Sequence, residues 1–448
     1  MQIVIVGAGN VGYTLARTLS KQHSVMMVEQ DEKRYEHIVE SLDIGAVNAN
    51  GASPRVLRNI INGKTKLFMA VTEHDEFNIF ACQVAKRIQP GLCTFARVRN
   101  PDYLEGDLRT EQMDVDHAFS PEKIAAAKMV RIATVENLID FESLPALGID
   151  LATFRINSRH ECVMHRPTDL IEMPPNSRIV AIHRGGQVII AHGTEVLQEG
   201  DEVTIIGPPE AVEAFDQTIG KFRKPSDFII VGGGILTEHL LSALNGSGRS
   251  VKVIEKDEAR CHMLSRKYDR VVIINDSGSD PAVLRNENVN MSDALICTTD
   301  SEEENLLACL IGKHLGVTKT VTRYSRREYE RIFTMNGIDA AIGYYHVVAN
   351  EIVKQTVPEL EVFLLLEGFR EQFFGITVNE KCRYGGCRVS EVDLPDRSTI
   401  AMVVRGGKAT VPRDDTVLEV GDVILVYAIR QDIARLERMF HTHIPIGV

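Results

Sequence analysis

Short apolar runs alternate with amphipathic stretches along the first hundred residues of the chain. After the first run, Val11, Leu15 and Leu19 are spaced four residues apart, so they form one stripe on a helix. The runs themselves have apolar residues at successive positions, which is typical of parallel strands that helices cover on both faces. We therefore predict a doubly wound, Rossmann-like α/β domain with strands at 2–6, 24–28, 46–48, 66–71 and 93–98.

The same pattern returns in the second half of the chain. The segment that begins at Ile3 aligns with the segment that begins at Phe228, and each reads strand, glycine turn, helix, strand and acidic residue. Further along, residues 68–87 align with residues 295–314. Agreement over this length indicates a tandem duplication.

A shorter segment of a different kind follows each Rossmann-like segment. Residues 178–207 align with 399–428, and both contain short apolar runs, an "RGG" turn and a "GD" turn. This pattern predicts a small α+β domain, and the polar stretch 221–227 is the predicted joint between the halves. The fold class is thus two Rossmann-like doubly wound domains, each followed by a small α+β domain. The predicted domains are 1–135, 136–222, 226–357 and 358–448.

Charge and hydropathy narrow the functional class. The 448-residue chain has a formal net charge of −12, which opposes binding to nucleic acid and to anionic lipid. No apolar run approaches the roughly 18–20 residues that span a bilayer, and the start lacks the basic flank of a signal peptide. We expect a cytoplasmic protein with no nucleic-acid partner and no direct membrane insertion.

The glycine turn after the first strand has the features of a dinucleotide site. Gly7, Gly9 and Gly12 form G-x-G-x-x-G between a strand and a helix, and Glu29 ends the next strand. The first glycine permits the turn, the second lets a pyrophosphate approach the backbone, and the third lets the helix pack closely. Glu29 would accept hydrogen bonds from the adenosine ribose and disfavour NADP. The alternative is a Rossmann-shaped domain that binds no nucleotide.

The second copy of the turn is less complete. Gly232 and Gly234 keep the turn, and Glu255 keeps the ribose acid, but Thr237 stands where the helix-packing glycine should be. A side chain at this position should push the helix away from the strand and shift the phosphate cradle. The sequence leaves open whether this site binds nucleotide.

Arginines at strand ends are further candidates for phosphate contact. Arg97 aligns with Arg323, and both would lie at the carboxyl ends of strands, where they would contact phosphate or form structural ion pairs. Arg99 aligns with Ser325, so the second half lacks one positive charge that could meet a terminal phosphate.

Catalytic and metal-binding patterns are missing from the sequence. A dehydrogenase needs a proton donor beside the nicotinamide, and the small domains have no evident acid–base pair. The chain has neither a P-loop nor G-x-S-x-G, its histidines form no metal motif, and Cys382 and Cys387 lack a matching pair. We predict no catalytic residues and no metal, hence a nucleotide sensor and not an enzyme; an NAD-dependent oxidoreductase is the distant alternative.

Acidic runs at helix starts and two apolar helical segments are further features that bear on the structure. Glu302, Glu303 and Glu304 are expected to cap a helix and face solvent, and Asp75 with Glu76 should do the same in the first half. The largely apolar helical segments 121–135 and 344–357 either cross to a neighbouring chain to build a dimer or pack on their own domain.

The order of these motifs resembles the TrkA family, the regulatory subunits of Trk potassium-uptake systems with tandem RCK (KTN) domains. The stretches that carry the resemblance are "IVIVGAGNVG", "GASPRVL", "AVTEHDEFNIFACQVAK", "ARVRNPDY" and the two "RGG…GD" segments, and it covers nearly the whole chain. It implies a homo-oligomeric gating ring, dimeric or tetrameric, that docks on the inner face of a TrkH-like membrane potassium translocator. The alternative within these domains is a regulator of a cation efflux channel or antiporter.

The resemblance also implies ligands and site residues. NAD or NADH, and ATP or ADP, would bind the Rossmann-like domains, with Arg97 and Arg99 near the distal phosphate and residues 50–52 near the adenine. The predicted nucleotide-binding residues are Gly7, Ala8, Gly9, Asn10, Val11, Gly12, Glu29, Asn50, Gly51, Ala52, Thr72, Arg97, Arg99, Gly232, Gly234, Glu255 and Arg323.

Overall fold

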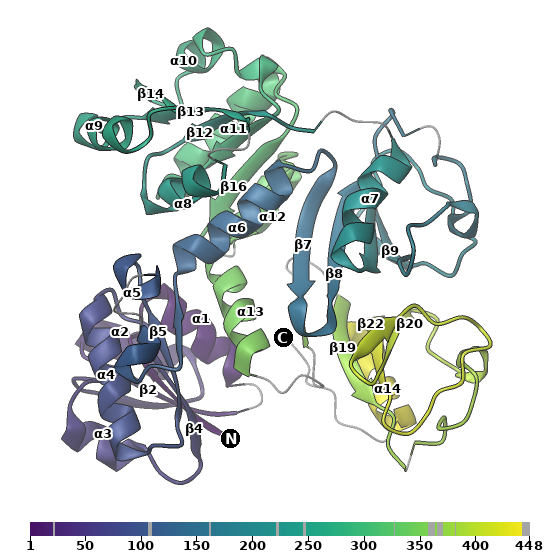
Figure 1. Cartoon of the computed structure of the whole chain (residues 1–448), viewed down its shortest axis with the longest axis horizontal. Helices are drawn as coiled ribbons and strands as arrows, with labels where there is room; N and C mark the ends of the chain where they lie inside the picture. The colour runs from purple at the N-terminus through teal and green to yellow at the C-terminus, as the bar shows by residue number, and fades with distance from the viewer. Residues whose placement is uncertain are drawn as a thin grey trace. The chain divides into compact units, whose positions relative to one another are not determined.

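The structure is a computed structural model of the whole chain (Figure 1). The structure describes residues 1–440 except 21–22, 106–109, 161–162, 221–223, 245–247, 327, 357–362, 365–370 and 381. The predicted joint at 221–227 therefore lies partly outside the described residues. The chain divides into two compact units, of which the first contains residues 1–126 and 343–356 and the second begins at residue 127.

The first Rossmann-like domain is a six-stranded parallel sheet in the order β3-β2-β1-β4-β5-β6. This is the order of a doubly wound dinucleotide-binding fold, so the predicted fold class is confirmed. Its strands are β1 (Gln2–Val6), β2 (Ser24–Glu29), β3 (Gly45–Asn48), β4 (Thr65–Ala70), β5 (Cys93–Arg97) and β6 (His117–Phe119). Its helices are α1 (Asn10–Leu19), α2 (Glu32–Ser41), α3 (Pro54–Ile60), α4 (Asp75–Ile88) and α5 (Asp102–Glu105). The sequence missed β6, which is only three residues long.

Strand β1 shows why both faces of this sheet are apolar. Ile3 and Ile5 point to one face, where they join a core cluster with residues of α1. Val4 and Val6 point to the other face, where they join residues of α3 and α4. All four side chains are buried, because successive residues of a strand face opposite sides and helices cover both.

The second Rossmann-like domain repeats the arrangement, with the order β14-β13-β12-β15-β16-β17. Its strands are β12 (Asp227–Val231), β13 (Ser250–Glu255), β14 (Val272–Asn275), β15 (Ala294–Cys297), β16 (Thr320–Tyr324) and β17 (Ala340–Gly343). Its helices are α8 (Ile235–Leu244), α9 (Glu258–Lys267), α10 (Pro281–Asn286), α11 (Glu302–Leu315) and α12 (Glu328–Met335). The tandem repeat found in the sequence is therefore a repeat of topology as well.

The two small domains are five-stranded sheets with a helix, in the orders β10-β9-β11-β8-β7 and β18-β19-β22-β20-β21. The first contains β7 (Leu138–Leu144), β8 (Ile149–Arg155), β9 (Arg178–Arg184), β10 (Gln187–Ile190), β11 (Glu202–Gly207) and α7 (Pro209–Ile219). The second contains β18 (Phe363–Leu364), β19 (Glu371–Thr377), β20 (Ser398–Arg405), β21 (Lys408–Thr410), β22 (Val423–Ile429) and α14 (Ile433–Phe440). Pairing across the RGG turns is antiparallel in both, and each domain is α+β, as the sequence predicted.

The small domains share one hydrophobic core within the second compact unit. Leu151 and Val180 of the first sheet lie in the same buried cluster as Phe373 and Leu425 of the second. The Arg178 guanidinium donates a 3.1 Å hydrogen bond to the backbone oxygen of Ile400. The two sheets thus pack against each other around this cluster.

Helix α13 (Tyr344–Thr356) follows the second sheet in sequence but packs on α1 of the first Rossmann-like domain (Figure 1). Val348, Ala349 and Ile352 lie in the buried cluster that contains Val11 and Leu15. The sequence predicted that this helix packs on its own domain or on a neighbouring chain. The structure shows a crossing between the two halves of one chain.

The matching helix of the first half, α6 (Pro121–Ala133), connects the first Rossmann-like domain to β7. Its carboxyl end lies in the second compact unit, where Lys319 of the second Rossmann-like domain binds the backbone oxygens of Ile132, Val135 and Leu138. In the described part of the chain, no helix is long and apolar enough to cross a membrane.

Candidate nucleotide-binding site

The first glycine turn has the backbone geometry that its three glycines permit. Gly7 has a φ of 99°, a conformation that L side chains rarely adopt. A Cβ at Gly12 would lie 1.9 Å from the backbone oxygen of Gly7, so α1 packs against the turn only because this residue has no side chain. At Gly9 the nearest atom to an added Cβ is an Arg34 nitrogen at 3.9 Å, which leaves space above the turn.

Glu29 connects the end of β2 to this turn. Its two carboxylate oxygens accept hydrogen bonds from the backbone nitrogens of Ala8, at 2.5 Å, and Asp31, at 2.8 Å. The residue is buried, with 8% of its surface exposed. The carboxylate therefore stands at the glycine turn, where each of its oxygens has a second lone pair for a ribose hydroxyl.

The loop after β3 packs against the end of β1. A Cβ at Gly51 would lie 2.1 Å from a methyl carbon of Val6, so this loop approaches the strand as closely as it does only with glycine. The Asn50 side-chain oxygen accepts a 2.8 Å hydrogen bond from the backbone nitrogen of Ala52. The side chain of Asn50 thus shapes its own loop.

Thr72 closes the opposite side of the turn. An added Cβ at Gly7 would meet the Thr72 methyl group at 2.9 Å. The Thr72 hydroxyl donates a 2.7 Å hydrogen bond to the side-chain oxygen of Asn78. The side-chain nitrogen of Asn78 donates a 2.9 Å hydrogen bond to the backbone oxygen of Arg97. One buried amide therefore holds the carboxyl ends of β4 and β5 together.

Arg97 and Arg99 meet at a carboxylate that the sequence analysis did not single out. An Arg97 terminal nitrogen lies 3.5 Å from Glu122, and the Nε of Arg99 lies 3.3 Å from the same oxygen. The Arg97 side chain is only 8% exposed, and its Nε has no hydrogen-bond partner in the described part of the chain. Two arginines and one carboxylate leave this cluster with an excess positive charge.

Asn10 has a partner that lies far away in the sequence. Its side-chain nitrogen donates a 2.9 Å hydrogen bond to the hydroxyl of Tyr345, on α13. Val11, the next predicted site residue, is buried in the core under α1 and so supports the turn by packing. No sequence signal connects Asn10 with Tyr345, because only the crossing of α13 brings them together.

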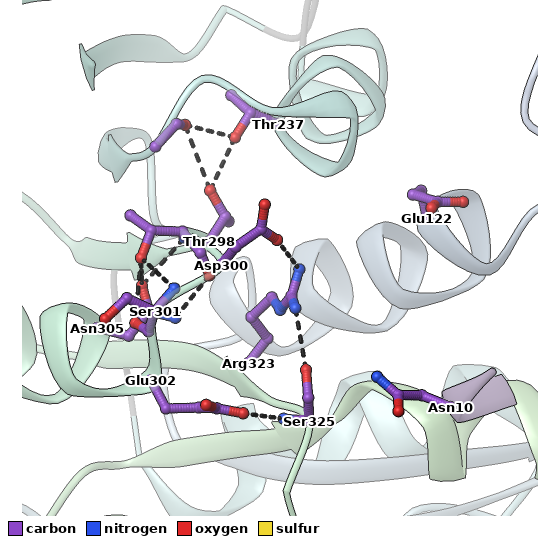
Figure 2. Close-up of polar contacts among 12 residues, drawn as sticks. Asn10, Glu122, Thr237, Thr298, Asp300, Ser301, Glu302, Asn305, Arg323 and Ser325 are labelled. Carbon is purple, nitrogen blue, oxygen red and sulfur yellow. Dashed lines mark hydrogen bonds and ion pairs between the residues drawn. The ribbon is translucent and has the colours of Figure 1, made fainter. Parts of the chain in front are cut away.

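The second turn accommodates Thr237 by hydrogen bonding (Figure 2). Gly232 has a φ of 100°, like Gly7. The Thr237 hydroxyl lies 2.6 Å from the backbone oxygen of Gly232 and 2.8 Å from the hydroxyl of Thr298. At Gly12 an added Cβ would lie 1.9 Å from a backbone oxygen, which is too close for any side chain. Thr237 has a Cβ at the equivalent position, so α8 must lie farther from its turn than α1 does.

Glu255 repeats the contacts of Glu29. Its carboxylate accepts hydrogen bonds from the backbone nitrogens of Gly233, at 2.5 Å, and Asp257, at 2.8 Å. At Gly234, the counterpart of Gly9, no atom of the described residues lies within 4 Å of an added Cβ. The acid and the open glycine are thus present in both halves.

Arg323 is held by its own neighbours (Figure 2). Its terminal nitrogens lie 3.1 Å from the carboxylate of Asp300 and 3.0 Å from the hydroxyl of Ser325. Ser325 therefore does more than remove the charge of Arg99, because its hydroxyl engages the neighbouring arginine.

The acidic run at the start of α11 is only partly the solvated cap that the sequence predicted. Ser301 caps the helix, and its hydroxyl accepts a hydrogen bond from the backbone nitrogen of Glu304. Glu302, however, is buried, and it accepts a 3.0 Å hydrogen bond from the backbone nitrogen of Ser325 while pairing with Arg326. Asp75 takes the same place in the first half, where it binds the backbone nitrogens of Arg99 and Asn100. These acids order the loops after β5 and β16.

Among the described residues, no group of three histidine, cysteine or acidic side chains could hold a metal ion. Cys382 is buried and Cys387 is partly buried, and both are free thiols.

Comparison with known proteins identifies the family. The TrkA-N domain family matches residues 3–121 and 228–343, and the TrkA-C domain family matches 168–220 and 373–441. The chain is 30% identical to Trk system potassium uptake protein TrkA homolog 1 of Methanosarcina mazei, over 98% of this chain and 100% of the relative. It is 31% identical to the TrkA homolog of Archaeoglobus fulgidus, with the same coverage.

Among solved structures, the GsuK channel bound to NAD has the same fold, with a TM-score of 0.64 and 17% identity, over 98% of this chain and 79% of that one. The two Rossmann-like domains correspond to the two TrkA-N matches, and the two small domains correspond to the two TrkA-C matches. The relatives align with nearly the whole length of the chain. This chain belongs to the family of Trk system potassium uptake proteins called TrkA.

Proposed function

We propose that the chain is a nucleotide-binding regulatory subunit that controls a membrane potassium-uptake translocator. The first Rossmann-like domain binds the nucleotide at the turn formed by Gly7, Gly9 and Gly12, with Glu29 on the ribose. The family name supports the link to potassium uptake over efflux, because the curated relatives are named as Trk uptake proteins.

The observation that carries the nucleotide proposal is the buried cation at the end of β5. The Arg97 side chain is 8% exposed, and among the described residues its Nε has no hydrogen-bond partner and its nearest carboxylate oxygen is 3.5 Å away. A buried guanidinium with an unsatisfied donor is costly unless an anion completes its contacts. The carboxyl ends of parallel strands are where Rossmann-like domains bind ligands, so a nucleotide phosphate is the fitting anion.

The ligands we propose are NAD or NADH and ATP or ADP. The GsuK channel, which shares the fold, is described as bound to NAD, and this supports the dinucleotide. For ATP, Arg99 would meet the terminal phosphate. Asn50, Gly51 and Ala52 would line the adenine side, since their loop follows β3 beside the ribose acid.

The proposed assembly is a ring of several copies on the inner face of the membrane, bound to a TrkH-like translocator. We further propose that the protein is cytoplasmic and peripheral, and that it is not an enzyme. Nucleotide would act by binding one conformation of the ring more tightly than another. An affinity ratio of about 10–100 corresponds to about 1.4–2.7 kcal/mol per site.

Calorimetric titration of the full chain with NADH, NAD, ATP and ADP tests the first part. Arg99→Ser, which copies the second half, should weaken ATP binding about tenfold because one charge-assisted phosphate contact is lost. NADH affinity should fall less. Co-purification with a membrane translocator, and potassium uptake that requires the chain, test the second part. A chain that binds none of the four nucleotides would contradict the proposed function.

A further inference from the structure

The two glycine turns differ at one residue in the first turn of the following helix. Tyr13 is the fourth residue of α1, and Glu238 is the fourth residue of α8. The Tyr13 ring stacks on His37 of α2, with 5.5 Å between ring centroids. Glu238 instead contacts two cations of α9, the helix that corresponds to α2.

These contacts use both oxygens of Glu238. One lies 2.5 Å from a terminal nitrogen of Arg260, and the other lies 2.6 Å from the Lys267 ammonium. The Nε of Arg260 donates to the backbone oxygen of Gly233, within the glycine turn itself. The Glu238 side chain is 18% exposed, so water screens these contacts only in part. Arg260 is therefore bound to the turn and to α8 at once.

Arg34 is the counterpart of Arg260 in the first half. The backbone nitrogens of both donate to the aspartate that caps their helix, Arg34 to Asp31 at 2.9 Å and Arg260 to Asp257 at 2.7 Å. In the part of the chain that the structure describes, no carboxylate pairs with the Arg34 guanidinium, which is exposed. Its terminal nitrogen is the nearest atom to the open position above Gly9, at 3.9 Å from an added Cβ.

We propose that Arg34 contacts the nucleotide phosphates at the first site, and that Glu238 withholds Arg260 from the same task at the second. The inference rests on the proposed function, since it concerns the phosphates of the bound nucleotide. Glu238 acts as a built-in anion that occupies Arg260, so a phosphate would have to displace this carboxylate to reach the guanidinium. The second turn therefore lacks the arginine contact that Arg34 offers at the first turn, and ligands that depend on this phosphate contact, ATP most of all, bind there more weakly.

Physical reasons favour this assignment over a purely structural ion pair. A guanidinium offers five donors in a planar fork, and the contacts to Glu238 and Gly233 direct two of its nitrogens away from any ligand. A phosphate would have to break a partly buried ion pair before it gained its own contact. At Gly9 a phosphate meets an arginine that no carboxylate of the described residues holds.

A reciprocal exchange in the full chain tests the inference. Glu238→Tyr should free Arg260 and strengthen ATP binding at the second site about tenfold, and Tyr13→Glu should capture Arg34 and weaken binding at the first site about tenfold. Both are measured by calorimetric titration with ATP and, in parallel, with adenosine, whose affinity should change less than threefold. Adenosine has no phosphate, so it separates charge effects from changes in the shape of the site.

Two further variants keep the result interpretable. Glu238→Gln retains the size of the side chain while it removes the charge, and it should reproduce part of the gain even if the tyrosine variant fails to fold. Glu238→Tyr combined with Arg260→Ala should lose the gain, because the freed arginine is then missing.

The outcomes separate the two proposals. A wild-type chain that binds no ATP overturns the proposed function and this inference with it. A wild type that binds ATP, with affinities that neither exchange nor the glutamine variant alters, overturns the inference alone. Two ATP sites of equal affinity in the wild type do the same.

Discussion

The Lys319 ammonium donates a 2.6 Å hydrogen bond to the backbone oxygen of Ile132, at the carboxyl end of α6. Two more backbone oxygens, of Val135 and Leu138, accept from the same nitrogen. An ammonium has three donors, and the last carbonyls of a helix lack partners within the helix. One buried side chain of the second half thus completes the end of a helix that starts in the first half.

Lys319→Met should lower the free energy of unfolding by about 2–4 kcal/mol, because it leaves buried carbonyls without donors. Urea denaturation of the full chain measures this. Lys313→Met is the matched control, since Lys313 pairs with Asp339 at 3.0 Å on a half-exposed surface and should cost about 1 kcal/mol or less. Equal losses in the two variants would contradict the role of Lys319.

The first small domain should lose stability in acid because of its buried histidines. Burial lowers the pKa of His183 to about 4, from an ordinary value of 6.5, and burial together with Arg159 lowers the pKa of His160 to about 4. Between pH 6.5 and 4 the unfolded chain binds protons that the native state does not, so stability falls as pH falls through this window. Each histidine accounts for about 2–3 kcal/mol.

His183→Gln tests this linkage, because glutamine keeps a polar side chain without a proton that titrates in this range. The difference in unfolding free energy between pH 7 and pH 4.5 should shrink by about 2 kcal/mol in the variant. An identical pH dependence in wild type and His183→Gln would refute the prediction.

The hydrogen bond between Asn10 and Tyr345 should contribute measurably to the docking of α13. Tyr345→Phe removes the acceptor at the glycine turn and should cost about 0.5–1.5 kcal/mol, since the buried contacts of Val348 and Ile352 remain. A double-mutant cycle with Asn10→Ala isolates the pair and should give a coupling energy of about 0.5–1 kcal/mol. Strictly additive effects would show that the pair does not couple.

The hydroxyl of Thr237, and not its bulk, should be what the second turn requires. Thr237→Val keeps the shape but leaves the oxygens of Gly232 and Thr298 without this partner, at a cost of about 1–2 kcal/mol. Thr237→Ser keeps the hydroxyl and should cost less than the valine variant. Thermal unfolding of both variants measures the order, and the reverse order would contradict the prediction.

Local pattern was sufficient to predict five of the six strands of the first Rossmann-like domain, the duplication and the glycine turns. A parallel strand covered on both faces must be apolar at successive positions, as Ile3, Val4 and Ile5 are. A left-handed backbone at Gly7 and a helix packed on its carbonyl at Gly12 both require glycine at fixed spacing. Each of these requirements involves residues that are close together in the sequence, so it can be recognised from one sequence alone.

The sequence did not predict which charges would meet. The sequence predicts Arg97 and Arg99 near phosphate, but it does not predict that Glu122 contacts them. That contact exists only because β5 and α6 pack together. Glu302 was expected in solvent, and the loop after β16 buries it. Ion pairing depends on distances between separate elements, and charge in a sequence carries no such distances.

What the sequence by itself determined is therefore the repeated α/β architecture and the location of both turns. Only the tertiary structure decided that α13 crosses to the other half of its own chain, that Lys319 closes α6, and that Glu238 binds Arg260. An apolar stripe requires burial but does not specify the surface that buries it, and a charged side chain does not specify its counter-ion. Both are settled when the whole chain packs.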